Sequence, residues 1–228
     1  MTIKENWERL YKFWDELDVE RAKAYDEVVR KEIGDTLEYA EQDIQRLEKW
    51  ASFEREWKSA STDEIKDLES NLGVALPKSF NESLSINAYE PQDQGFVYPW
   101  LGSFNMMQNP EEIVEITTEN REDLDYEVFE DPNDLMQEDY EMWSDKWIVI
   151  FDWNGNYCAV LDLREDEEFY GNVLCMCIED GTIAKWADSY EEWFELVVDE
   201  VLRYGQLRLS TIENLLSPPR SVFGEIVG

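Results

Sequence analysis

The chain has 228 residues, of which 43% are hydrophobic and 14% aromatic, enough for a packed core and too many for a disordered acidic tail. Its 54 acidic and 20 basic residues give a formal net charge of −34, which disfavours nucleic acid and anionic membranes as partners and favours a basic protein. The absence of histidine excludes Ser-His and Cys-His nucleophile pairs and removes the commonest metal ligand. We therefore expect no catalytic residues, no bound metal and no cofactor. A carbohydrate-associated enzyme that uses paired carboxylates as acid and base is the weaker alternative.

Residues 1–58 are predicted to form an N-terminal helical extension. Apolar and aromatic residues recur at helical spacing throughout it, and Gly34 is the expected break between two helices. Residues 1–60 carry 16 acidic and 11 basic residues, a net charge of −5, whereas residues 61–228 carry 38 and 9, a net charge of −29. The mixed charges of the first part are typical of a solvated helical hairpin. We expect an appendage or a docking element.

Two helices are predicted between Ser61 and Asn87. Ser61 or Thr62 can cap the first, with acidic residues in its first turn, and Gly73 ends it because glycine adopts the left-handed conformation readily. A short second helix follows Pro77 and stops near Asn87. Residues 89–104 are then aromatic and loop-like, and serve either as a ligand pocket or as cover for the core.

A helix is predicted from about Glu111 to Thr118, at the start of the most acidic stretch of the chain. Residues 111–145 hold 15 acidic residues and a single basic one, Arg121, and we expect them to form an acidic insertion. The stretch also contains several aromatic side chains, which a merely repulsive linker does not need. An insertion with no partner is the alternative.

A local antiparallel meander is predicted to begin at Lys146. β-Branched and aromatic runs are joined by Asn154-Gly155 and Asp180-Gly181, both strong signals for a hairpin turn. Ser189 is expected to begin the helix that follows, and residues 211–228 are expected to form a C-terminal tail. The resulting fold class is α+β, with an antiparallel sheet flanked by helices and an N-terminal helical extension.

Two motifs suggest metal or redox chemistry and are better explained by structure. The segment after Asp152 resembles a calcium loop, but Tyr157 stands where the glycine belongs and Leu163 where the bidentate glutamate belongs. Cys175 and Cys177 share one face of a strand, and no second ligand pair exists, so buried structural cysteines are expected. The odd number of cysteines, the polar N-terminus and the lack of a membrane-spanning run lead us to expect a cytoplasmic protein.

Several motifs of the chain resemble the SUKH superfamily, named for fungal cell-wall regulators of the Smi and Knr type. An acidic helix ends in Leu72-Gly73-Val74-Ala75-Leu76-Pro77, which looks like the opening of that domain, and Asn87 sits where the family has an asparagine. Ala88-Tyr89 stands in place of the usual Gly-Gly. Further matches run in the family order: Trp147-Ile148-Val149-Ile150, Gly155-Asn156-Tyr157, Leu161-Asp162-Leu163 and Ser189-Tyr190-Glu191-Glu192-Trp193.

The resemblance implies a SUKH-like α+β domain, which we place at residues 59–210. Bacterial members are typically immunity proteins that bind and block toxins, often nucleases, and fungal members act as regulatory scaffolds. We therefore expect an immunity protein that neutralises a basic toxin through an acidic surface. A non-enzymatic cytoplasmic regulatory scaffold of the Smi/Knr type, bound to another basic protein, is the alternative. The oligomeric state stays open.

The hypothetical partner-binding residues all lie in the acidic insertion. Aromatic side chains would be the anchors, since interface energy concentrates in desolvated aromatics, and carboxylates would supply the attracting field. The anchors are Tyr126, Phe129, Tyr140 and Trp143. The carboxylates are Glu122, Asp123, Asp125, Glu127, Glu130 and Asp131.

Overall fold

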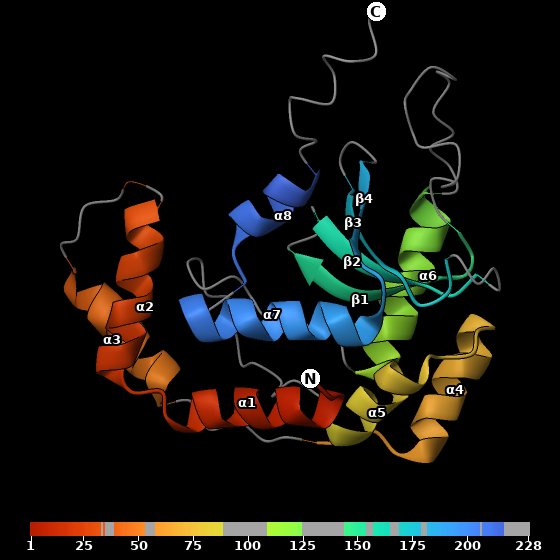
Figure 1. The fold of residues 1–228 in the computed structure, drawn as a ribbon, viewed down its shortest axis with the longest axis horizontal. Coiled ribbons are helices and arrows are strands. Elements are labelled where there is room, and N and C mark those ends of the chain that lie inside the picture. The colour runs from red at the N-terminus through yellow and green to blue at the C-terminus, as the bar shows by residue number, and fades with distance from the viewer. Residues whose placement is uncertain are drawn as a thin grey trace, which may run out of the picture.

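The fold was taken from a computed structural model (Figure 1), which describes residues 1–32, 34, 39–52, 58–88, 109–124, 144–153, 157–164, 169–178, 182–205 and 207–216. These residues form eight helices and one four-stranded sheet, which confirms the α+β class. The helices are α1 (Ile3–Asp15), α2 (Val19–Glu32), α3 (Glu41–Ala51), α4 (Thr62–Leu72), α5 (Lys78–Ile86), α6 (Pro110–Leu124), α7 (Tyr190–Tyr204) and α8 (Leu209–Leu216). The strands are β1 (Trp147–Trp153), β2 (Tyr157–Asp162), β3 (Val173–Cys177) and β4 (Ile183–Ala187).

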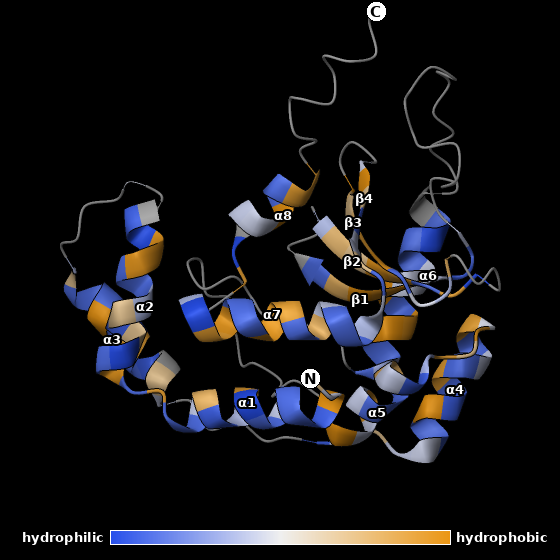
Figure 2. Ribbon diagram, viewed as in Figure 1, coloured by the Kyte–Doolittle hydropathy of each residue, from blue (hydrophilic) through white to orange (hydrophobic). Residues whose placement is uncertain are grey.

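The sheet is the predicted antiparallel meander, in the order β1-β2-β3-β4. Trp153 pairs with Tyr157 and Met176 with Ile183, so both expected hairpins form, although their turn residues lie outside the described part of the chain. Every residue of β3 is buried, and all of β2 is buried except Tyr157. Figure 2 shows hydrophobic residues on the strands and alternating hydrophilic and hydrophobic stretches on the surrounding helices. The sheet is therefore the centre of the core.

All three cysteines are buried and free, as predicted for Cys175 and Cys177. In an antiparallel pair, directly opposed residues share a face. Cys175 lies opposite Ala159, and the two side chains share a face. Cys158 precedes Ala159 on β2, so its side chain points to the other face of the sheet. Burial raises the pKa of Cys175 to about 12 and that of Cys158 well above its usual value. These thiols are protonated packing groups.

The N-terminal run contains one more break than we predicted. The prediction of a single helix before Gly34 was wrong, because α1 ends at Asp15 and α2 begins at Val19. Asp18 Oδ1 accepts a hydrogen bond from the Arg21 backbone N–H at 2.9 Å, an N-terminal cap that starts α2. Leu17, only 6% exposed, is buried at the corner between the two helices.

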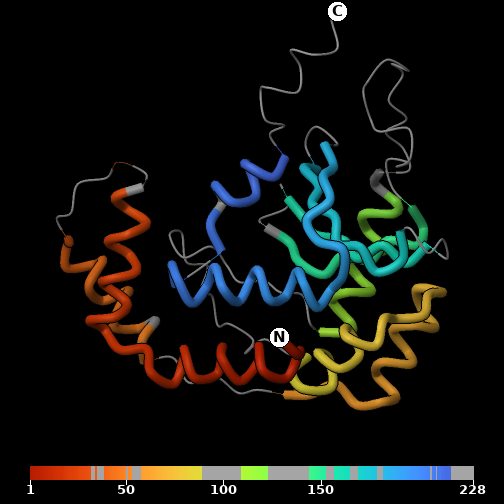
Figure 3. The backbone as a smooth tube through the Cα atoms, viewed as in Figure 1, coloured from red at the N-terminus to blue at the C-terminus, as the bar shows by residue number. Residues whose placement is uncertain are grey.

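Helix α1 packs against α7 and α5, on the side of α7 away from the sheet (Figures 1 and 3). Trp7 is 2% exposed, and its Nε1–H donates to Ser83 Oγ at 3.0 Å. The Tyr190 hydroxyl donates to the same oxygen at 2.9 Å, so one buried serine joins α1, α5 and α7. The rings of Trp7 and Phe194 lie 5.0 Å apart. Helix α1 is thus part of the same hydrophobic core as the sheet.

Helices α2 and α3 pack against each other at the end of the molecule opposite α4 and α6 (Figure 1). Two aspartates and two arginines form an ion-pair network between them. Arg30 bonds Asp26 at 2.7 Å and Asp43 at 3.1 Å, and Arg46 lies 3.3 Å from Asp43. The Tyr25 hydroxyl donates to the Leu202 carbonyl at 3.3 Å and ties this pair of helices to α7.

The predicted caps of α4, α5 and α7 are confirmed. Ser61 Oγ accepts from the Glu64 backbone N–H at 3.2 Å, and Gly73 ends α4 with a φ of 65°. Helix α5 ends at Ile86, with Asn87 as its cap, and Ser189 caps the first turn of α7. These ends could be predicted because a cap is formed by residues within one turn of each other.

Helix α8 was not predicted, and it contains residues 211–216, which we had assigned to the tail. It packs on β3 and β4, and Ile212 is fully buried. Glu200 anchors its start by accepting from Arg208 Nε at 2.6 Å and from the Thr211 hydroxyl at 2.7 Å. So short a helix depends on tertiary packing more than on helix propensity.

Replacing Trp7 with alanine should destabilise the protein by about 3–5 kcal/mol, because it empties a buried ring site and removes a hydrogen bond to Ser83. Urea unfolding followed by circular dichroism measures the change. Glu8→Ala, at an exposed position of the same helix, should change stability by less than about 0.5 kcal/mol. Equal effects of the two substitutions would contradict the packing of α1 described above.

Replacing Gly205 with alanine should destabilise the protein by more than about 1 kcal/mol. Its φ is +76°, and a methyl group there would lie 2.8 Å from Cβ and Cγ of Tyr25. Gly73→Ala is the matched control, since its φ of +65° is similar and no heavy atom lies within 4 Å of the added methyl group. Thermal unfolding should show the larger loss for Gly205→Ala, and the opposite order would be inconsistent with the close approach of α2.

Candidate protein-binding surface

Helix α6 begins the stretch that we predicted to be an acidic insertion, residues 111–145, of which residues 125–143 lie outside the described part of the chain. Asn109 Oδ1 accepts from the Glu111 backbone N–H at 3.0 Å and so caps the first turn, with Pro110 as the first helical residue. The predicted end at Thr118 was wrong, because the helix continues to Leu124. Arg121 stabilises the added turns by donating to the carbonyl oxygens of Leu72 and Trp147, both at 3.4 Å, and of Asp145.

The inner face of α6 lies against α4 and β1. Ile113 and Thr117 are fully buried there. The Val149 backbone N–H donates to Thr117 Oγ1 at 3.0 Å, so a side chain of α6 satisfies a peptide group of β1. The orientation of the helix about its own axis is set by these contacts.

The outer face of α6 carries four exposed glutamates, Glu112, Glu115, Glu119 and Glu122, which we call the acidic stripe. Their spacings of three, four and three residues place them on one side of a helix with 3.6 residues per turn. Glu111 is exposed beside the first of them. None of the four glutamates forms an ion pair with another described residue. As far as the described residues go, the stripe is therefore a row of carboxylates without ion-pair partners.

Glu112 has a raised pKa, first because burial partly removes its carboxyl from water and then because Glu115 and Glu111 repel its charge. A cation placed against the stripe would relieve this repulsion.

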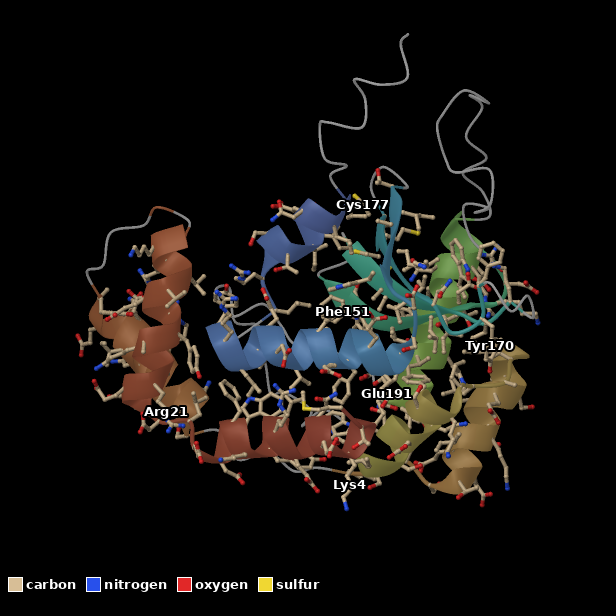
Figure 4. The ribbon with its side chains drawn as sticks, viewed as in Figure 1. Lys4, Arg21, Phe151, Tyr170, Cys177 and Glu191 are labelled. Atoms are coloured by element: carbon tan, nitrogen blue, oxygen red, sulfur yellow. The ribbon has the colours of Figure 1, made fainter. Side chains whose placement is uncertain are left out.

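Several carboxylates elsewhere in the described chain have basic partners. Arg21, which Figure 4 labels at the end of the molecule opposite the stripe, bonds Glu16 at 3.0 Å. Arg9 pairs with Asp199, and Arg208 pairs with Glu200 at 2.6 Å. The acidic stripe differs from these sites in having its charge uncompensated.

The two bases nearest the stripe in sequence are directed away from it. Arg121 donates to carbonyls, as described above, and burial lowers its pKa. Lys146 Nζ donates to the Gly73 carbonyl at 3.0 Å, at the C-terminal end of α4. Cations are favourable at the negative end of a helix, so both bases stabilise α4 rather than neutralise α6.

Of the predicted partner-binding residues, Glu122 is the one whose side chain the structure describes, and it is exposed at the end of the stripe. Asp123 lies in the last turn of α6, and its side chain is not described. The other predicted residues lie outside the described part of the chain: Asp125, Tyr126, Glu127, Phe129, Glu130, Asp131, Tyr140 and Trp143.

Glu112, Glu115 and Glu119 were not singled out from the sequence. Their three- and four-residue spacing was a usable signal, but we had ended the predicted helix at Thr118, before the last two members of the stripe. The stripe also depends on which side of the helix faces the sheet. That choice required the contact between Thr117 and Val149, which are 32 residues apart.

No group of three or more histidine, cysteine, aspartate or glutamate side chains in the described residues could hold a metal ion. Asp162 is completely buried, and its carboxylate is held by Arg164, whose Nε lies 3.1 Å from both oxygens and whose Nη2 lies 2.7 Å from Oδ2.

No helix in the described ranges has the length and apolarity needed to cross a membrane.

A family model described as the SMI1 / KNR4 family (SUKH-1) matches residues 59–196, from the residues just before α4 into α7. The match covers more than half of the chain, and helices α1 to α3 precede it. No curated protein matches the chain.

Replacing Glu112 with glutamine should stabilise the protein at pH 7 by about a few tenths of a kcal/mol. A raised carboxyl pKa means that the folded state binds the proton more tightly than the unfolded chain, so the ionised carboxylate destabilises the fold. The gain should be complete above the raised pKa and should disappear as the pH falls below the ordinary value of 4.5. Urea unfolding across this pH range measures it, and a loss of stability at pH 7 would contradict the assignment.

Proposed function

This chain belongs to the SMI1/KNR4 family (SUKH-1), and we propose that it is an immunity protein that binds and neutralises a basic bacterial toxin. The observation that carries the proposal is the acidic stripe of α6, a row of exposed carboxylates without ion-pair partners among the described residues. We propose that the chain acts by binding alone, in the cytoplasm, with no cofactor and no catalytic step.

The proposed mechanism begins with electrostatic capture. A net charge of −34 attracts a basic protein over distances comparable with the Debye length, about 8 Å at physiological ionic strength. A toxin that acts on nucleic acid needs a basic surface to hold phosphates, and carboxylates can occupy that surface. Lysines or arginines of the toxin would relieve the repulsion between Glu112, Glu115 and Glu111, which gives the contact a local driving force.

The second step of the proposed mechanism is anchoring by aromatic side chains. Salt-screened charges on an interface rim contribute more to association rate than to residence time, so a tight complex needs desolvated anchors. The acidic insertion continues from the end of α6, and its Tyr126, Phe129, Tyr140 and Trp143 remain the predicted anchors. Their carboxylate neighbours, from Glu122 to Asp131, would extend the field of the stripe.

The triple substitution Glu112→Gln, Glu115→Gln and Glu119→Gln should weaken toxin binding at least about tenfold at an ionic strength of about 0.15 M. The partner is the toxin against which the chain protects cells in co-expression growth assays. The Kd of its complex with each variant is measured by calorimetry. The matched control is Glu20→Gln, Glu27→Gln and Glu48→Gln, exposed positions of α2 and α3 that change the net charge equally. The control should bind nearly as well as the parent chain and keep the same dependence on salt.

Charge reversal between Glu122 and Asp131 tests the predicted continuation of the surface in the same assays. Loss of growth protection and of complex formation would support it. The alternative, a regulatory scaffold, would be favoured by two results together. The chain would bind a cellular regulatory protein, and it would not protect cells from any toxin encoded by a neighbouring gene. Turnover of a substrate by the purified chain would contradict the proposal of binding without catalysis.

A further inference from the structure

Helix α6 takes the place of a neighbouring strand along the outer edge of β1. The edge strand of a sheet presents unpaired N–H and C=O groups that need partners when they are buried. Thr117 Oγ1 accepts from the Val149 N–H at 3.0 Å. One helical turn later, Arg121 Nη2 donates to the Trp147 carbonyl at 3.4 Å. Two side chains thus supply the acceptor and the donor that a fifth strand would have supplied.

The same two residues lie opposite the acidic stripe on α6. At about 100° per residue, Thr117 and Arg121 point to one side of the helix, and the four glutamates centre roughly 180° away. A rotation of α6 about its axis would therefore move the hydrogen bonds and the carboxylates together. Such a rotation is unfavourable because Thr117 is fully buried and its Oγ1 would lose the hydrogen bond from the Val149 N–H.

We infer that Thr117 and Arg121 are positioning residues for the partner-binding surface: they fix the rotation of α6 and thereby the direction in which Glu112, Glu115 and Glu119 face. This inference rests on the proposed function, because it concerns the same surface. Thr117 and Arg121 do not touch the partner. They act through the carboxylates, whose charges must be presented as a row to a row of cations.

The test replaces Thr117 with valine, which keeps the shape of the side chain and removes the acceptor, and with serine, which restores the hydroxyl. In Thr117→Val the Val149 N–H should exchange with solvent about tenfold faster by NMR, and in Thr117→Ser its rate should return to within about twofold of the parent rate. The binding probe is a synthetic helical peptide with lysines three and four residues apart. Its Kd should rise about tenfold for Thr117→Val, but not for Thr117→Ser.

Arg121→Lys is the second variant, because lysine keeps the charge but cannot reach three carbonyl groups at once; its Kd should also rise. The Glu112→Gln, Glu115→Gln, Glu119→Gln variant separates the two proposals. Suppose that the triple glutamine variant weakens peptide binding, whereas a folded Thr117→Val protein binds the peptide normally. The positioning role is then overturned and the binding surface stands. If the triple glutamine variant leaves peptide binding unchanged, the binding surface itself is overturned. Unchanged exchange of the Val149 N–H in Thr117→Val would also overturn the positioning role.

Discussion

The structure depends on closing the outer edge of β1 with a helix. A buried strand edge cannot leave its peptide groups unpaired, and α6 satisfies two of them through Thr117 and Arg121. Once those side chains point inward, helical geometry directs Glu112, Glu115 and Glu119 outward. The exposure of the acidic stripe is thus a consequence of how the sheet edge is satisfied. A single constraint connects the core of the protein to its most distinctive surface.

The distribution of basic residues makes that surface acidic in effect as well as in composition. Arg30 and Arg46 neutralise Asp26 and Asp43 between α2 and α3, and Arg121 and Lys146 are directed to the end of α4. These four cations are therefore used in ion pairs and at a helix end. Among the described residues, the acidic stripe keeps four exposed carboxylates without an ion-pair partner, so negative charge remains on this surface of α6.

The N-terminal helices extend the family domain rather than simply preceding it. The family model begins at residue 59, yet Trp7 of α1 shares a buried serine with Tyr190 of α7. Helix α1 covers the side of α5 and α7 away from the sheet, and it leads to α2 and α3 at the end far from α6 (Figure 1). The surface of α6 is left uncovered by this arrangement of the N-terminal helices.

The sequence by itself determined the features that arise between near neighbours: the caps at Ser61, Gly73 and Ser189, the two hairpins, and the antiparallel meander of consecutive strands. Only the tertiary structure decided the length of α6, the existence of α8 and the membership of the acidic stripe. Each depends on a bond between distant residues, such as Thr117 with Val149 or Arg121 with Leu72. Helix and strand propensities cannot predict such bonds, because the two partners come together only when the chain has folded.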